Sequence, residues 1–367
     1  MNILIQLSHP AHYHLYKNVA KNLMVDGHKV FILIKTKDIL EDLLKQSGLP
    51  YYNILTEAHR KNKLGILWDM FVRDWRMLRF VRKNKIDLLT GSTVEVAQVG
   101  WLTRKYRVNT GEDDMRVVPL VQELGGLFMQ SLLSPVVCDN WRLEPKSVKY
   151  ASYHELAYLH PNHFSADKTI VERYFPTDTP FFILRFASLN AHHDVGIKGI
   201  NTEIAQHLID ILKPHGRIYI TSERELEPQF EQYRIPINTL DIHHVMAFST
   251  LYIGDSQTMA AEAAVLGVPF VRFNDFVGRI GYLNELENVY HLGFGIKASE
   301  EGSADKMYRT VEELLSLPDL KAEWQRRRQK MLSEKIDYAQ FLTWFIEYYP
   351  ESRDIMKKNP DYQLRFK

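Results

Sequence analysis

The stretch LYIGDSQTMAAEAAVLGVP, residues 251–269, joins a strand, a turn and a helix without a spacer. Its first four residues are an apolar run, which predicts a short buried strand over 251–254. Apolar residues then recur at helical spacing up to Leu266, and Gly267 suits the left-handed position that ends a helix. A strand that leads directly into a helix is the repeating unit of a parallel α/β sheet.

The turn that opens this helix suits a diphosphate, because a helix N-terminus offers free backbone N–H groups and the positive end of the dipole. Ser256 and Thr258 would add hydroxyl donors, and Glu262, about two turns further on, would accept from ribose hydroxyls. The alternative is a capped helix without a ligand, since Asp255 and Ser256 are both good N-cap types and no glycine-rich loop is present. The candidate donor-binding residues of this turn are Ser256, Gln257, Thr258, Met259 and Glu262.

Strands and helices alternate along the rest of the chain, which indicates parallel sheets with right-handed crossovers. The predicted strands are 2–8, 28–35, 51–55, 86–90, 181–186, 217–221, 251–254 and 269–273. We predict an α/β fold of two facing, doubly wound, Rossmann-like domains, with their strand ends around one cleft. The predicted domains are 1–165 on the acceptor side, 166–346 for the nucleotide sugar, and a C-terminal segment, 347–367, that crosses back onto the first domain.

Composition excludes several classes of protein. Lys plus Arg number 46 and Asp plus Glu 45, so the basic excess expected of a nucleic-acid-binding protein is missing and no nucleic-acid partner is expected. The single cysteine, Cys138, allows no disulfide within the chain and fits a reducing compartment. The N-terminus lacks the pattern of a signal peptide and no apolar run is long enough to span a membrane, so we expect a cytoplasmic protein.

Six short motifs follow one another along nearly the whole chain. They are HPAHYH at 9–14, ELAYLHP at 155–161, LRF at 184–186, AHHD at 191–194, ITSE at 220–223, and the stretch 255–269. In this order they resemble domain-of-unknown-function family 354, a GT-B-like group often met in polysaccharide loci. The resemblance implies a GT-B-like fold and a nucleotide-sugar substrate.

The stretch 255–269 also resembles the phosphate-binding turn of GT-B glycosyltransferases and of the non-hydrolysing UDP-N-acetylglucosamine 2-epimerases. Asp255, Ser256, Glu262 and the run 266–269 fall in register with the pattern of the epimerases. Gln257 and Thr258 stand where the epimerases have two glycines, which puts a close approach of the backbone to phosphate in doubt.

Three histidines follow the first predicted strand. An inverting sugar transfer needs a base to deprotonate the acceptor hydroxyl, and the resemblance to GT-B transferases implies that the base lies just after this strand. His12 is the first candidate for this catalytic base and His14 the second, while Pro10 would shape the turn and His9 would cap or pack. The competing interpretation is a metal site, but the turn has no nearby cysteine or assured carboxylate ligand. We therefore expect no metal, and no cofactor beyond the nucleotide-sugar substrate.

Polar residues also lie near the ends of the first two strands of the second half, and Arg185 is on the first of them. Arg185 could hold phosphate oxygens through its forked guanidinium. His193 and Asp194 would pair and orient a substrate, or lie in a surface loop. Ser222 and Glu223 would hold ribose or sugar hydroxyls, or cap the next helix.

Two further sets of polar residues are candidates for the site. His243 begins the helix before the strand 251–254. The resemblance to GT-B folds implies that it contacts the nucleotide base, and the alternative is a solvated histidine beside the N-cap Asp241. The cluster 112–114 places carboxylates at another predicted strand end, from which Asp114 would pair with a histidine of the N-terminal turn.

The segment 60–85 is strongly basic. Between His59 and Lys85 the chain has nine Lys or Arg and two acids, interleaved with aromatic residues. Such a helix suits peripheral contact with an anionic membrane. It would also have to bury a face on its own sheet, and its arginines could instead receive an anionic acceptor.

The leading hypothesis is a metal-independent, inverting glycosyltransferase of surface polysaccharide assembly. It would move a sugar from a nucleotide-sugar donor to a glycan, a lipid-linked glycan or a glycoconjugate. A 2-epimerase using Glu112, Asp113, Asp114 and Glu223, or a non-catalytic nucleotide-sugar-binding protein, are the alternatives.

Overall fold

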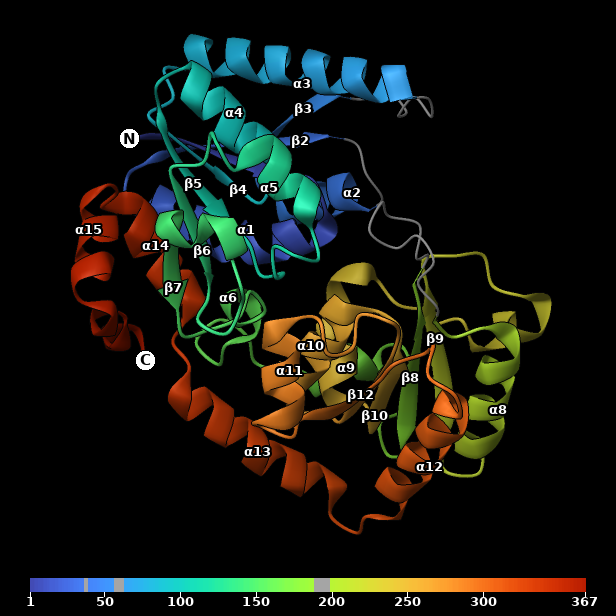
Figure 1. Ribbon diagram of the computed structural model, residues 1–367. Coiled ribbons are helices and arrows are strands. Elements are labelled where there is room, and N and C mark those ends of the chain that lie inside the picture. The colour runs from blue at the N-terminus through green and yellow to red at the C-terminus, as the bar shows by residue number, and fades with distance from the viewer. Residues whose placement is uncertain (36–38, 56–62, 188–198) are drawn as a thin grey trace. The chain divides into compact units, whose positions relative to one another are not determined.

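The computed structural model describes residues 1–35, 39–55, 63–187 and 199–367, which form two compact units (Figure 1). Unit 1 comprises 1–163 and 335–367, and unit 2 comprises 164–334. The chain therefore leaves the first unit, forms the second, and returns to the first.

Unit 1 is built on a seven-stranded sheet in the order β3-β2-β1-β4-β5-β6-β7, in which every neighbouring pair is parallel. Its strands are β1 (Asn2–Leu7), β2 (Lys29–Lys35), β3 (Tyr51–Leu55), β4 (Leu88–Gly91), β5 (Tyr106–Thr110), β6 (Ser131–Pro135) and β7 (Ser147–Tyr150). The first four were predicted from the sequence. The end of β5 was expected from the carboxylate cluster 112–114, whereas β6 and β7 were missed because they are short and partly polar.

Helices cover both faces of this sheet (Figure 1). They are α1 (Pro10–Val25), α2 (Leu40–Ser47), α3 (Lys63–Lys83), α4 (Val94–Leu102), α5 (Pro119–Gly125), α6 (Leu156–Leu159), α14 (Tyr338–Glu347) and α15 (Glu351–Lys358). Met77 and Val81 of α3 and Val96 of α4 pack with Leu4 and Phe31 of the sheet in one buried cluster. Helix α1 contacts α2, α6 and α14. The apolar stripe of each helix thus provides its contact with the sheet or with a neighbouring helix.

Unit 2 has a five-stranded parallel sheet in the order β12-β11-β10-β8-β9. Its strands are β8 (Phe181–Phe186), β9 (Arg217–Ser222), β10 (Leu251–Gly254), β11 (Phe270–Phe273) and β12 (Gly293–Ile296). Its helices are α7 (Lys168–Glu172), α8 (Thr202–Leu212), α9 (Ile242–Phe248), α10 (Gln257–Leu266), α11 (Gly281–Asn288), α12 (Ser303–Ser316) and α13 (Leu320–Glu334).

The strand order reverses once in each sheet, between β1 and β4 in unit 1 and between β8 and β10 in unit 2. Ligands of open parallel sheets bind beyond the carboxyl ends of the strands at such a reversal. The histidine turn follows β1, Arg185 is on β8, and the turn at Ser256 follows β10. Three of the predicted motifs therefore lie at the reversal point of their own sheet.

The division into units differs from the predicted domain boundaries. The first division falls after His163, two residues before the predicted one after 165. The second falls after Glu334, and the predicted boundary after 346 is corrected accordingly. The physical reason is that α14 packs against α1 and α6, and Asp337 before it accepts a hydrogen bond from the amide of Asn162 at 3.0 Å. The C-terminal helices do cross back onto the first unit, as the predicted fold class states.

Candidate functional site

The candidate site of unit 2 is built around the turn between β10 and α10. Ser256 caps the helix, with its hydroxyl oxygen accepting from the N–H of Met259 at 3.5 Å. The first turn, Ser256 to Met259, is half-buried, whereas the helix beyond it is buried. Gly254 permits the close approach of β8, because a Cβ here would lie 3.0 Å from the carbonyl oxygen of Arg185. The predicted strand, turn and helix are thus present, with N–H groups of the first helical turn at the strand end.

Asp255 does not cap the helix. Its buried carboxylate accepts from the N–H of Ala187 at 2.6 Å and from that of Ile200 at 3.3 Å. Burial raises the pKa of Asp255 from 3.8 to about 6, and the two backbone N–H groups oppose that shift. Its carbonyl oxygen accepts from the amide of Asn274 at 2.8 Å. Asp255 therefore ties the end of β8 and the approach to α8 to the N-terminus of α10.

Arg185 lies beside this turn and is held by the neighbouring strand. One guanidinium nitrogen donates to the hydroxyl of Thr221 at 2.9 Å, and another forms an ion pair with the exposed carboxylate of Glu223. The Nε of Arg185 is buried and has no hydrogen-bond partner among the described residues. To bind a diphosphate, Arg185 would exchange the exposed Glu223 for phosphate oxygens.

Arg224 is a cation of this region that the sequence reasoning missed. Its guanidinium donates to the carbonyl of Ile200 at 2.9 Å and lies over the ring of Phe186 at 5.1 Å. The predicted binding residue Ser222 instead shapes the turn, because its hydroxyl donates to the carbonyl of Arg224 at 2.7 Å and accepts from the N–H of Arg224 at 3.1 Å. The only feature of the sequence that could have indicated Arg224 is its position two residues after the end of β9.

His243 and Glu262, predicted separately as contacts for the base and the ribose, form one pair. The Nε2 of His243 lies 2.9 Å from the carboxylate of Glu262, and both side chains are buried. Helix α9 precedes β10 in the chain and α10 follows it, and the two helices pack together, which brings the two residues into contact. A ribose bound at Glu262 would therefore have to share the Glu262 carboxylate with His243. The other predicted pair, His193 and Asp194, lies outside the described residues.

The three histidines of the turn after β1 in unit 1 have three different surroundings. His9 caps α1, because its Nδ1 accepts from the N–H of Ala11 at 3.2 Å, and Pro10 occupies the first turn. The Nδ1 of half-buried His12 accepts from the N–H of Ser8 at 3.3 Å, which favours the neutral tautomer with its proton on Nε2.

His14 is buried, and its ring lies 5.1 Å from that of Tyr13 and 5.2 Å from that of Tyr158. This placement favours His12 over His14 as the catalytic base, because His14 packs in the interior of unit 1.

The carboxylates after β5 have different surroundings. Oε1 of Glu112 accepts from the N–H of His154 at 2.7 Å, and Oε2 lies 3.3 Å from the Nδ1 of its ring. The pKa of Glu112 lies well above its usual range, mainly because of burial and secondly because of the negative charge of Glu155. Burial lowers the pKa of His154 to about 3. Asp114 accepts from the N–H of Asp139 at 2.8 Å and so secures the loop after β6.

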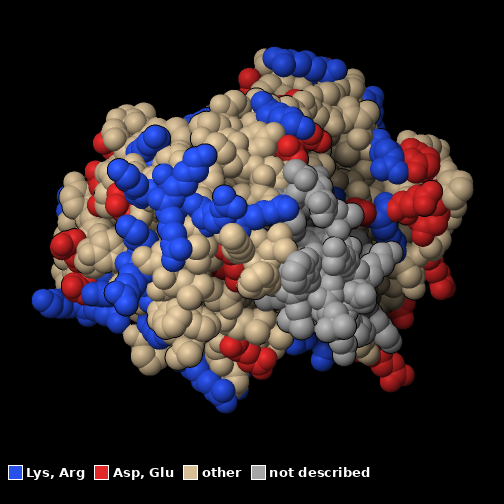
Figure 2. Space-filling view, turned by 90° about the horizontal axis from the view of Figure 1, so that it is seen from above, with Lys and Arg blue, Asp and Glu red and all other residues tan. Residues whose placement is uncertain are grey.

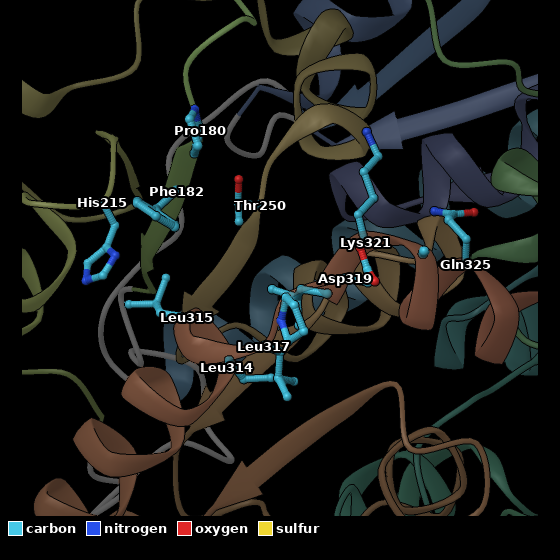
Figure 3. Close-up of a pocket in the computed structure, with 13 residues that line it drawn as sticks. Pro180, Phe182, His215, Thr250, Leu314, Leu315, Leu317, Asp319, Lys321 and Gln325 are labelled. Atoms are coloured by element: carbon cyan, nitrogen blue, oxygen red, sulfur yellow. The ribbon is translucent and has the colours of Figure 1, made fainter.

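Unit 2 also has a cavity of about 580 Å³, and Figure 3 shows the side chains that line it. It is lined by Pro180 and Phe182 at the start of β8, by Thr250 just before β10, and by residues of α12 and α13. These positions mark the amino ends of the strands, so the cavity is not part of the candidate site. Among the described residues no group of three His, Cys, Asp or Glu side chains is arranged to hold a metal ion.

Solved structures share this architecture over nearly the whole chain. The UDP-GlcNAc 2-epimerase from Neisseria meningitidis bound to UDP-GlcNAc has 14% identity, a TM-score of 0.63, and coverage of 94% of this chain and 99% of that one. The S. aureus MnaA–UDP complex has 12% identity, a TM-score of 0.65, and coverage of 96% and 97%. The spinosyn rhamnosyltransferase SpnG with spinosyn aglycone has 14% identity, a TM-score of 0.59, and coverage of 94% and 100%.

The fold is GT-B-like. This confirms the predicted α/β class with two Rossmann-like units and the predicted relation in fold to GT-B glycosyltransferases and 2-epimerases. No family model and no curated protein matches the chain, so membership of family 354 stays a prediction.

Proposed function

We propose that the protein is a glycosyltransferase that moves a sugar from a nucleotide-sugar donor to a glycan, lipid-linked glycan or glycoconjugate acceptor. The observation that carries the proposal is the N-terminus of α10 at the reversal point of the unit 2 sheet, beside Arg185, in a GT-B-like fold. Helix N-terminal N–H groups and an arginine fork are the donors that a diphosphate leaving group requires. Surface polysaccharide assembly, a cytoplasmic location and a mechanism without metal belong to the same proposal.

Unit 2 would bind the donor. The N–H groups at Gln257 and Thr258 and the guanidinium of Arg185 would take the diphosphate, while Glu262 would take the ribose. As the sugar leaves, negative charge builds on the diphosphate, so these donors would stabilise the transition state more than the ground state. His12 of unit 1 would accept the proton of the attacking hydroxyl, with inversion at the anomeric carbon.

Calorimetric titration with UDP-, GDP-, CMP- and dTDP-sugars tests donor binding. We expect Arg185→Ala to weaken the best donor by about 10- to 100-fold, the worth of a charge-assisted hydrogen bond. Arg217→Ala is the matched control, because Arg217 is an exposed arginine at the amino end of the adjacent strand β9. If the Arg185→Ala variant binds the donor as tightly as the wild type does, the donor does not bind at this turn.

Transfer itself is tested with the same donor and a panel of acceptors. His12→Ala should lower kcat at least about 100-fold, the usual contribution of a general base, and leave donor affinity unchanged. If this variant transfers the sugar as fast as the wild type does, His12 is not the catalytic base. Loss of donor binding in the variant would instead make His12 a structural residue.

A sugar-nucleotide 2-epimerase is the second candidate, favoured by the buried acid Glu112 at the end of β5. A buried acid whose pKa is raised is suited to supply a proton to a substrate. NMR of the donor alone separates the two functions, because epimerisation converts the sugar without an acceptor and Glu112→Gln would abolish that conversion. Gln257 and Thr258, in place of two glycines, count against this candidate.

A further inference from the structure

We propose that one face of unit 1, formed by the outer side of α3 and the corner between α4 and β5, binds the surface of an anionic lipid bilayer. We call this surface the cationic–aromatic face. Its described exposed residues are Phe71, Trp75, Arg76, Arg79, Arg82, Lys83, Lys85, Trp101, Leu102, Arg104 and Tyr106.

Helix α3 has two faces, which reconciles packing on the sheet with a surface role. Its inner face carries Met77 and Val81 into the buried cluster of unit 1, and the buried Arg73 forms an ion pair with Glu95 of α4. Its outer face exposes Phe71 to 63%. The guanidinium of Arg79 lies 5.3 Å from the ring centre of Trp75 on this outer face. Packing on the sheet and contact with a membrane therefore do not exclude each other, because α3 has a separate face for each.

The corner between α4 and β5 extends the surface beyond the helix that was predicted. Trp101 is 50% exposed and Leu102 is 52% exposed at the end of α4. With Arg104, Lys105 and Tyr106 they line a cavity of about 570 Å³. The start of β5 adjoins the segment after α3, since Tyr106 donates its N–H to the carbonyl of Asp87 at 3.2 Å. The cavity thus offers cations and aromatic rings to a lipid headgroup at one edge of the face.

Charge on this face is of one sign. Between residues 71 and 107 the chain has nine Lys or Arg and three acids. None of the three acids is exposed: Glu95 is buried with Arg73, Asp87 accepts from the N–H of Asn2 at 2.8 Å, and Asp74 is half-buried. Figure 2, which looks onto α3 from above, shows Lys and Arg gathered there. The whole chain is nearly neutral, so the positive charge is local.

A bilayer is the partner that fits both kinds of side chain. Arginine and lysine attract anionic headgroups, and tryptophan and tyrosine favour the interface between headgroups and acyl chains. Phe71 and Leu102 are exposed and have no polar side-chain atom, so they contribute only by leaving water. No helix among the described residues is long and apolar enough to cross a membrane. The contact would therefore lie on the bilayer surface.

Flotation with vesicles tests this surface without any turnover, so its outcome is independent of the proposed function. The full-length protein should float with phosphatidylcholine vesicles that contain phosphatidylglycerol, but not with phosphatidylcholine alone, and salt should release it. The variant Arg76→Glu, Arg79→Glu, Arg82→Glu should bind at least about 100-fold more weakly, at about fivefold for each charge. Phe71→Ser with Leu102→Ser should also weaken binding, with the salt dependence kept.

The matched control is Lys306→Glu, Arg309→Glu, Lys330→Glu, which reverses three exposed cations of unit 2 and should bind as the wild type. Circular dichroism checks folding, and the glutamine versions of the α3 changes serve should the reversals unfold the chain. Equal binding to both kinds of vesicle, or equal loss in the control variant, would overturn the proposal. So would binding of single-stranded RNA by the wild type without flotation, which would make the partner a nucleic acid.

Discussion

At the scale of single residues, buried carboxylates hold the strand ends of unit 2 in place. Asp255 accepts two backbone N–H groups with a pKa raised from 3.8 to about 6. Glu287 of α11 accepts from the Nε of Arg272 at 3.0 Å, and both side chains are buried. Arg272 in turn donates to Asn274, the residue that holds the carbonyl of Asp255. A chain of buried polar contacts therefore runs from α11 to the candidate site.

Asp255 should make stability depend on pH. Because its folded pKa lies above the unfolded value, the folded state binds an extra proton between about pH 4 and about pH 6, and unfolding free energy falls as pH rises through that window. The expected fall is ~3 kcal/mol. Urea unfolding of the wild type and Asp255→Asn across this range measures it. The difference between the two curves should change with pH, and parallel curves would contradict the prediction.

Breaking the buried pair on one side should destabilise unit 2. Arg272→Met leaves the Glu287 carboxylate buried without its partner, at an expected loss of about 3–5 kcal/mol. Thermal unfolding measures the loss. The control is the double variant Arg272→Met with Glu287→Leu, which removes both charges and should be more stable than the single variant. A double variant as unstable as the single one would show that packing, not charge, is responsible.

At the scale of elements, the turn after β10 depends on how closely that strand approaches β8. A Cβ at Gly254 would lie 2.8 Å from the Cβ of Arg185 and 2.7 Å from the hydroxyl of Tyr252. The contact with Arg185 is too short for two packed strands, and the contact with Tyr252 lies within β10, so glycine is required for Arg185 to lie next to the N-terminus of α10. The spacing of the candidate donor groups is thus a property of the β8–β10 pair.

Gly254→Ala should separate the two strands and lower stability by roughly 1–3 kcal/mol, the usual result of overpacking. The matched control is Gly111→Ala, because a Cβ at Gly111 meets its nearest neighbours at 3.4 Å and 3.5 Å, which are ordinary contacts. Denaturant unfolding of both variants provides the comparison. If Gly254→Ala unfolds at the wild-type midpoint, the close approach of the strands is not required.

At the scale of the whole molecule, the chain finishes unit 2 with α13 and returns to unit 1 with α14. Phe341 of α14 is fully buried in unit 1, and Trp324 of α13 is buried in unit 2, where its indole donates to the carbonyl of Leu292 at 2.7 Å. Two consecutive helices therefore stabilise different units. Each unit should respond to changes in its own core.

Phe341→Ala should destabilise unit 1 by about 3–5 kcal/mol and leave unit 2 little changed, and Trp324→Ala should do the reverse. Hydrogen exchange measures each unit separately, through the amides of β1 and β4 in unit 1 and of β8 and β10 in unit 2. Each variant is the control for the other. Equal loss of protection in both units from either change would mean that the two units unfold as one.

The sequence by itself determined the parallel α/β class, the strand, turn and helix of 251–266, and the positions of the motifs at strand ends. These features depend on residues adjacent in the chain, through hydrophobic period, capping types and helix-ending glycines. Ser256 as N-cap and Gly267 in the left-handed conformation are examples. The fold class could be read for the same reason, since the alternation of strands and helices is itself local.

Only the tertiary structure decided which polar groups meet. It paired His243 with Glu262, gave Asp255 two backbone donors from beyond its own turn, and buried His14 against Tyr158. It also added β6, β7 and β12, and it moved the second boundary to follow Glu334. Each of these outcomes depends on the burial and packing of residues far apart in the chain, which no local pattern encodes.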